Sequence, residues 1–217
     1  RQIEPVVLFA CDGILHGGQA HDRTAVVAEL LAQLTSVRDA VLVPCLDGAA
    51  DVQAWAAPGR GLHRWADLLA GEAVCEPKWL PFDHPLWIVY SSGTTGLPKP
   101  IVHGHGGVML EMLKMGGLHN DLGPSVQAGE RFHWYSSTGW IMWNTQVGAL
   151  MGGTTVCIFD GNPGGTRERP DWSTLWRFAA LTRTTFFGAG AAFYASCLKA
   201  GVSPKDVADL SSLRALG

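Results

Sequence analysis

The sequence predicts an α/β fold, with mainly parallel sheets and flanking helices. Short apolar runs of strand length alternate with segments whose apolar residues recur at helical spacing. The 12 prolines and 27 glycines are typical of many short connections between such elements. No stretch approaches the roughly 20 apolar residues that a membrane-spanning helix needs.

The first third of the chain predicts a strand, a helix and a second strand, in the order of a parallel crossover unit. The apolar run after Pro5 is typical of a strand buried on both faces. Asp22 or Thr24 stands where a helix would be capped, and Leu30, Leu31 and other apolar residues then follow at helical spacing. In chain order we expect a strand at 6–10, a helix at 26–34, a strand at 40–43 and a helix at 62–69.

The same alternation continues to the end of the sequence. The Pro/Gly-rich region 56–85 is the weakest point, and we interpret it as a connection inside one domain. The apolar run 213–217 resembles the start of another strand, so we expect a piece of a longer chain. The remaining expected strands are 86–90, 132–135, 154–159 and 184–187, and the expected helices are 108–113, 141–150, 172–180 and 191–199.

Composition argues against several classes of protein. Hydrophobic residues make up 47% of the chain and charged residues 16%, which indicates a globular protein. The formal charge of −3, without basic runs, argues against nucleic-acid and anionic-membrane partners. The five cysteines are scattered without CxxC or zinc spacing, which favours a reducing cytoplasm and no metal site.

The most informative string is YSSGTTGLPKP, from Tyr90 to Pro100. A buried strand leads into a loop in which Gly93 and Gly96 permit positive φ and close backbone approach to an anion. Lys99 supplies a positive charge for a phosphate group. The hydroxyl donors of this candidate phosphate loop are Ser91, Ser92, Thr94 and Thr95.

Two other interpretations compete with a phosphate loop of this kind. Ser, Thr and Gly are also ordinary residues of a flexible surface turn. The Walker P-loop requires a lysine directly after a glycine and before Ser or Thr. Lys99 follows Gly96 by three residues and precedes Pro100, so the Walker pattern fails.

The whole string resembles the phosphate-binding signature of the adenylate-forming superfamily, which includes acyl-CoA synthetases. Further strings are similar to the acetoacetyl-CoA synthetases within it. By this resemblance the chain, 1–217, is part of an N-terminal AMP-binding domain, and the C-terminal lid domain is absent. The strings are LFACDG at 8–13, HDR at 21–23, PIVHGHGG at 100–107, LHNDLG at 118–123, STGWIMWN at 137–144 and FDGNP at 159–163.

The resemblance implies ATP-dependent ligation of acetoacetate to coenzyme A through an acyl-adenylate. ATP with Mg²⁺, acetoacetate and CoA would be the small-molecule partners, and Lys99 would be the catalytic residue of the loop. The adenine, ribose and hinge motifs would follow Gly217, so we expect residues 1–217 by themselves to be inactive. The alternatives are another short-chain acyl-CoA synthetase, such as an acetyl-CoA synthetase, and a non-catalytic nucleotide-binding module.

The resemblance places the acid beside Trp140, Ile141 and Met142. Bulky residues after Gly139 would restrict the length of the acid, although two tryptophans three apart also suit a buried helix face. The C3 oxygen of acetoacetate needs a hydrogen-bond donor, which the indole of Trp140 or Trp143 or the amide of Asn144 would supply.

By the same resemblance, Gly188 and Ala189 lie near the nucleotide and the CoA thiol. A tight strand-to-helix turn needs small residues there as well. His103 and His105 lack a third metal ligand nearby, and we expect them to form hydrogen bonds at the helix entry.

Overall fold

A computed structural model describes residues 2–91 and 96–217. The chain divides into two compact units, Arg1–Lys78 and Trp79–Gly217. The boundary falls within the Pro/Gly-rich region 56–85 that the sequence indicated as weakest. We describe each unit by itself.

The first unit is built on a parallel sheet in the order β1-β4-β5. Helix α1 contributes Val27 and Leu31 to its core, while Leu30 of the same helix is 45% exposed. The side chain of Asp22 accepts a hydrogen bond from the amide of Thr24 at the start of the helix (2.7 Å). The elements are β1 (Val7–Cys11), α1 (Thr24–Gln33), β4 (Asp39–Val43) and β5 (Gly61–Arg64).

The sequence prediction was wrong at two places in this unit. A helix was expected over 62–69, but its first residues form β5, because Leu62 packs into the core beside the paired strand β4. The polar, Gly-rich stretch after β1 forms an antiparallel hairpin that was not predicted. These elements are β2 (Gly13–His16), β3 (Gln19–Asp22), η1 (Val52–Trp55) and α2 (Trp65–Leu69).

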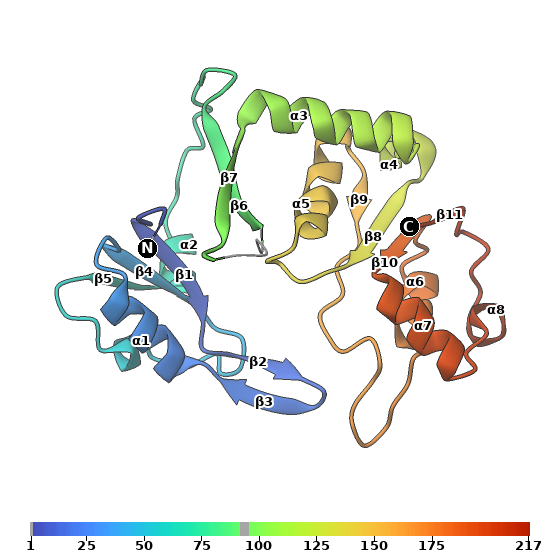
Figure 1. Ribbon diagram of the computed structural model, residues 1–217, viewed down its shortest axis with the longest axis horizontal. Coiled ribbons are helices and arrows are strands. Elements are labelled where there is room, and N and C mark those ends of the chain that lie inside the picture. The colour runs from blue at the N-terminus through green and yellow to red at the C-terminus, as the bar shows by residue number, and fades with distance from the viewer. Residues whose placement is uncertain (1, 92–95) are drawn as a thin grey trace. The chain divides into compact units, whose positions relative to one another are not determined.

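The second unit contains a parallel sheet in the order β11-β10-β8-β9 (Figure 1). Strand β10 is buried at every residue, and its Phe187 and Ala189 pack against helices α6 and α7. On its other face Phe186 packs with Phe132 and Leu122. The elements are β8 (Arg131–Tyr135), β9 (Thr155–Val156), α6 (Thr174–Leu181), β10 (Phe186–Ala189), α7 (Ala191–Lys199) and β11 (Ala215–Leu216).

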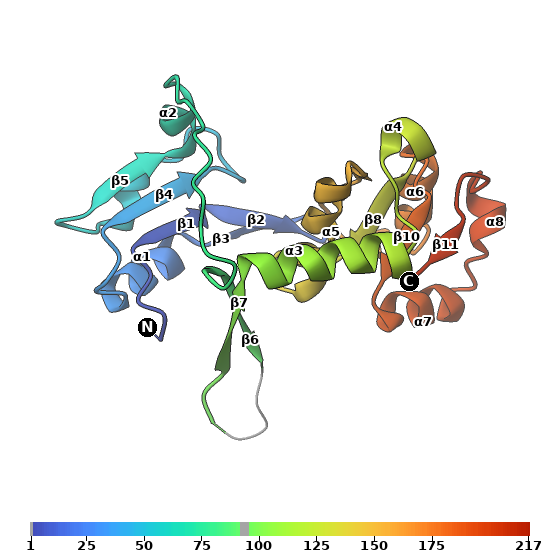
Figure 2. The ribbon, with the colours of Figure 1, turned by 90° about the horizontal axis from the view of Figure 1, so that it is seen from above.

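An antiparallel hairpin of β6 (Pro85–Ser91) and β7 (Lys99–Gly104) carries the candidate phosphate loop (Figure 2). The strand expected at 86–90 is confirmed. Strand β7 was not predicted, and here the mainly parallel pattern does not hold. Pro100 is tolerated because β7, in the part of the chain that the structure describes, is an edge strand paired with β6 alone.

Helices connect the hairpin to the parallel sheet. The fold class is confirmed, and most expected elements shift by only a few residues, but the strand expected at 154–159 is limited to β9. The connecting elements are α3 (His105–Lys114), the π-helix η2 (Met115–His119), α4 (Ser125–Ala128), α5 (Ile141–Gly148), η3 (Ala149–Gly152) and, before β11, α8 (Pro204–Val207).

Candidate functional site

The β6–β7 hairpin presents Lys99 directly opposite Ser91. Lys99 is exposed, and its ammonium group makes no ion pair within residues 2–91 and 96–217. Gly96 adopts φ +104°, within the positive range that a glycine permits at this point of the loop. Ser92, Gly93, Thr94 and Thr95 lie outside the described residues. The described part of the loop therefore offers a free cation beside a glycine turn.

A cavity of about 530 Å³ lies between this hairpin and the start of α5. Its wall includes two of the residues expected to hold the acid, Trp140 and Ile141, together with residues of strand β6. Met142, also expected there, does not line this cavity, and neither does Trp143. The other lining residues that matter here are Trp87, Val89, His103, Thr138 and Asn144.

A second cavity, of about 410 Å³, opens where β10 leads into α7. Trp140 lines this cavity as well as the first, so the two cavities share one residue of their walls. The hydroxyl of Tyr135 donates to the carbonyl of Gly161 (3.3 Å), and burial together with the Asp160 charge raises the pKa of Tyr135. Other residues of the wall are Trp134, Trp172, Gly190 and Phe193.

Gly188 and Ala189, expected near the nucleotide and CoA, are buried within β10. A Cβ on Gly188 would lie 2.0 Å from the ring of Trp134, so packing alone requires glycine there. Gly190, the residue that precedes α7, lines the second cavity, and a Cβ on it would meet nothing within 4 Å. The turn thus reaches the cavity through Gly190, while a ligand role for Gly188 and Ala189 stays a prediction.

Comparison with known proteins bears on this arrangement. The whole chain, residues 1–217, matches the family described as AMP-binding enzyme. The chain belongs to the AMP-binding enzyme family. Within that family it is similar to the acetoacetyl-coenzyme A synthetase of Rhizobium meliloti (strain 1021), with 37% identity over 215 residues. That match covers 98% of this chain and 31% of the relative.

Two further relatives widen the picture. A solved acetoacetyl-CoA synthetase from Streptomyces lividans aligns with a TM-score of 0.87 and 46% identity, covering 99% of this chain and 31% of that one. The malonamoyl-CoA synthetase vrtB of Penicillium aethiopicum is 29% identical over 204 residues, which is 89% of this chain and 28% of that protein. The chain thus spans about a third of the length of these AMP-binding relatives.

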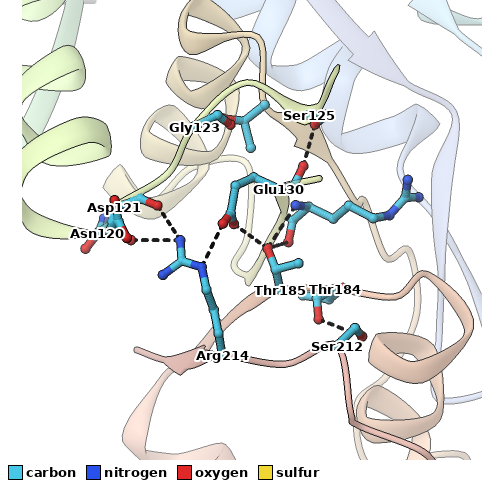
Figure 3. Close-up of polar contacts among 11 residues, drawn as sticks. Asn120, Asp121, Gly123, Ser125, Glu130, Thr184, Thr185, Ser212 and Arg214 are labelled. Atoms are coloured by element: carbon cyan, nitrogen blue, oxygen red, sulfur yellow. Dashed lines mark hydrogen bonds and ion pairs between the residues drawn. The ribbon is translucent and has the colours of Figure 1, made fainter. Parts of the chain in front are cut away.

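A polar network that sequence reasoning missed connects strands β8 and β10 with the segment that leads into β11 (Figure 3). The carboxylate of Glu130 is 9% exposed and accepts from Arg214 Nε (2.7 Å) and from the hydroxyl of Thr185 (2.5 Å). Arg214 also donates to the carbonyls of Asn120 (3.1 Å) and Asp121 (2.5 Å). No local pattern signals this network, because its members lie 84 or more residues from Arg214 along the chain except Thr185.

His133 is buried in β8 among aromatic rings, at centroid distances of 4.9 Å from Phe178 and 5.3 Å from Phe187. Burial lowers the pKa of His133, and the hydrogen bond between its Nδ1 and the Cys157 carbonyl (2.8 Å) opposes that shift only in part. His133 is therefore a neutral core residue of the scaffold rather than a member of either cavity.

Within the described ranges, no group of three or more His, Cys, Asp or Glu side chains gathers where it could hold a metal ion. None of the helices in those ranges is long and apolar enough to cross a bilayer.

Proposed function

We propose that the full-length protein ligates acetoacetate to coenzyme A, using ATP and passing through an acyl-adenylate. The observation that carries this proposal is the cavity between the β6–β7 hairpin, which holds Lys99, and the start of helix α5 at Trp140 and Ile141. Relatives at up to 46% identity are named acetoacetyl-CoA synthetases, which supports the same activity. ATP and CoA are then substrates.

In the first half-reaction a carboxylate oxygen attacks the α-phosphorus of ATP, and the bond to the β-phosphate oxygen breaks. Pyrophosphate leaves with that electron pair. Carboxylate and triphosphate repel one another, so the site must supply positive charge and hydrogen-bond donors at the departing group. We assign Lys99 this charge and the loop from Ser91 to Gly96 the donors.

In the second half-reaction the thiol sulfur of CoA attacks the acyl carbonyl, AMP leaves with the bridging oxygen, and the thiol proton is released. The second cavity, at Gly190, is our candidate approach for the thiol, because Trp140 lines both this cavity and the first one. Ala189 and Gly188 support this turn from within the sheet.

We propose that Mg²⁺ enters as the counter-ion of ATP. The described residues do not form a cluster that would hold it as a resident metal. Carried in on ATP, it would share with Lys99 and the loop amides the neutralisation of the departing pyrophosphate.

The names of the relatives reduce the number of candidate acid substrates. Acetoacetate and malonamate are both short carboxylates with a carbonyl on the third carbon, and the relatives are named for these acyl groups. Trp140 and Ile141 would limit the length of the acid. An acetyl-CoA or other short-chain acyl-CoA synthetase is the alternative, and a nucleotide-binding module without turnover is the alternative of another class.

Acid-dependent ATP–pyrophosphate exchange tests the proposal in the full-length protein. The panel is acetate, propionate, butyrate, acetoacetate and 3-hydroxybutyrate. We expect acetoacetate to exceed butyrate by about 10- to 100-fold in kcat/KM, because butyrate leaves a donor of the cavity unpaired. Equal values for acetate or butyrate would favour the general short-chain enzyme. Nucleotide binding without exchange for any acid would favour the binding module.

We also propose that the chain is part of a longer N-terminal AMP-binding domain, with the lid domain supplied by other residues. Its 31% coverage of the relatives supports this organisation. A cytoplasmic location is proposed because the five cysteines are scattered singly along the sequence, without the spacing of a disulfide framework.

A further inference from the structure

We propose that His103 determines the acid specificity of the first cavity, by donating a hydrogen bond to a carbonyl oxygen on the third carbon of a short carboxylic acid. Asn144 assists it from helix α5. The inference rests on the proposed function and adds a residue of the phosphate hairpin to acid recognition.

The register of the hairpin places His103 on the face that carries Lys99. His103 pairs with Trp87, Ile101 with Val89, and Lys99 with Ser91. Residues at positions i, i+2 and i+4 of a strand share one face, so Lys99 and His103 project on the same side, about 13 Å apart along β7. That separation leaves room for a phosphate chain at the Lys99 end and a short acid at the His103 end.

Within residues 2–91 and 96–217, the hydrogen-bonding capacity of the His103 side chain is not used. Among the residues described, neither its imidazole nor the amide of Asn144 takes part in a hydrogen bond, although both line the cavity. His105, two residues later, differs: its Nδ1 bonds the carbonyl of His84 (2.8 Å) at the helix entry, as expected for both histidines. His103 is thus left facing the space that a ligand would occupy.

The chemistry of the wall limits what this pair of groups would recognise. An imidazole carries an N–H donor in either tautomer, and a primary amide carries two. The wall around them contains apolar side chains, including Val89 and Ile141. A ligand oxygen at this end would bond His103 or Asn144, whereas a methylene group would leave their donors unpaired. Thr138, before α5, is the polar side chain that the test separates from them; Tyr90, Trp87 and Trp140, which also carry hydrogen-bond donors, line the wall as well.

The experiment compares acetoacetate with butyrate in the full-length protein, for the wild type and the variants His103→Leu, His103→Gln and Thr138→Val. We expect His103→Leu to lower kcat/KM for acetoacetate by about 10- to 100-fold and to leave butyrate within about threefold. The KM for ATP should change little. His103→Gln, which keeps a donor, should restore most of the preference for acetoacetate.

Several outcomes would overturn the inference. Equal losses for both acids in His103→Leu would make His103 a structural residue of the hairpin. Loss of the preference in Thr138→Val, with retention in His103→Leu, would move recognition to Thr138. If His103→Leu does not fold, His103→Gln replaces it in the test. A His103→Gln protein that has lost the preference for acetoacetate would then overturn the inference. A wild type inactive with every acid would overturn the proposed function itself, which is a distinguishable result.

Discussion

The hairpin β6–β7 and the strands β8 and β10 differ in how their side chains are used. Strand β10 is buried at all four residues, and β8 holds Phe132 and His133 in the core. In the hairpin, apolar residues remain open to solvent, with Tyr90 44% and Val102 56% exposed. Close packing therefore limits which side chains the sheet accepts, while contact with a ligand limits which side chains the hairpin accepts. Substitutions in the hairpin should change activity, and those in the sheet should change stability.

The largest expected effect concerns Lys99, which is exposed and should contribute little to folding. Lys99→Ala should slow ATP–pyrophosphate exchange on the order of 10²- to 10³-fold, because its charge acts on the departing pyrophosphate. The melting temperature should stay near that of the wild type. Exchange assays and thermal melts of the full-length protein check both parts.

Lys199→Ala is the matched control, since this lysine is also exposed but ends helix α7. Its exchange rate should equal the wild-type rate. An unchanged rate in Lys99→Ala would remove Lys99 from the mechanism, and a large drop in melting temperature would break the distinction between hairpin and sheet.

The second effect concerns Gly188 and should appear as lost stability. In Gly188→Ala the new methyl group would meet the ring of Trp134 at 2.0 Å, so the ring or the strand must move. Overpacking of this kind costs about 1–3 kcal/mol. Thermal melting of the full-length protein, with hydrogen exchange of peptides from β8 and β10, would measure it.

Gly190→Ala is the control for that substitution, because a Cβ at Gly190 meets nothing within 4 Å and its φ is −63°. We expect its stability to stay within about 0.5 kcal/mol of the wild type. If Gly188→Ala is as stable as Gly190→Ala, packing against Trp134 does not explain the glycine, and its predicted role near the nucleotide gains support.

The smallest effect is a pH dependence at His133. Its folded-state pKa lies below the ordinary value of 6.5, so the unfolded chain binds the proton more readily. The neutral, buried form of His133 therefore contributes stability that is fully present above about pH 6.5. This contribution is lost as the pH falls towards the folded-state pKa, by at most about 1.4 kcal/mol per pH unit.

Hydrogen exchange of the β8 peptide between about pH 7.5 and about pH 5.5 would report this local loss, after correction for the intrinsic rates. His133→Gln cannot titrate, so its opening free energy should vary less with pH. The same pH dependence in both proteins would show that other groups cause the acid sensitivity.

Much of the fold was predictable because buried strands and amphipathic helices differ in the period of their apolar residues. The errors have local causes. Leu62 and Leu69 suit a helix by spacing, but pairing with β4 draws the first residues of that segment into a strand. Strand β7 was missed because it contains Pro100, a residue that is rare in strands. Strands β2 and β3 were missed because their polar composition has no apolar period. Pairing between distant segments decides such cases, and a local pattern does not contain it.

The candidate site was predictable where chemistry is concentrated in a short string. The lysine and glycines of the phosphate loop were found in this way, as were Trp140 and Ile141. Asn144 lines the cavity with Ile141 because residues three apart share a helix face, whereas Met142 and Trp143 are turned to other sides. The position of His103 depends on the register of β7, which was not predicted.

The ion pair between Glu130 and Arg214 also has a consequence for how the polypeptide is made. Glu130 leaves the ribosome 84 residues before its partner. At about 5–20 residues per second, that interval lasts roughly 4 to 17 s. Even after Thr185 has emerged, the carboxylate lacks the Arg214 guanidinium to neutralise it, so its burial beside Thr185 is unfavourable until Arg214 emerges. We expect β8 and β10 to reach their final packing only after Arg214 has emerged, which makes this pair a late step in co-translational folding.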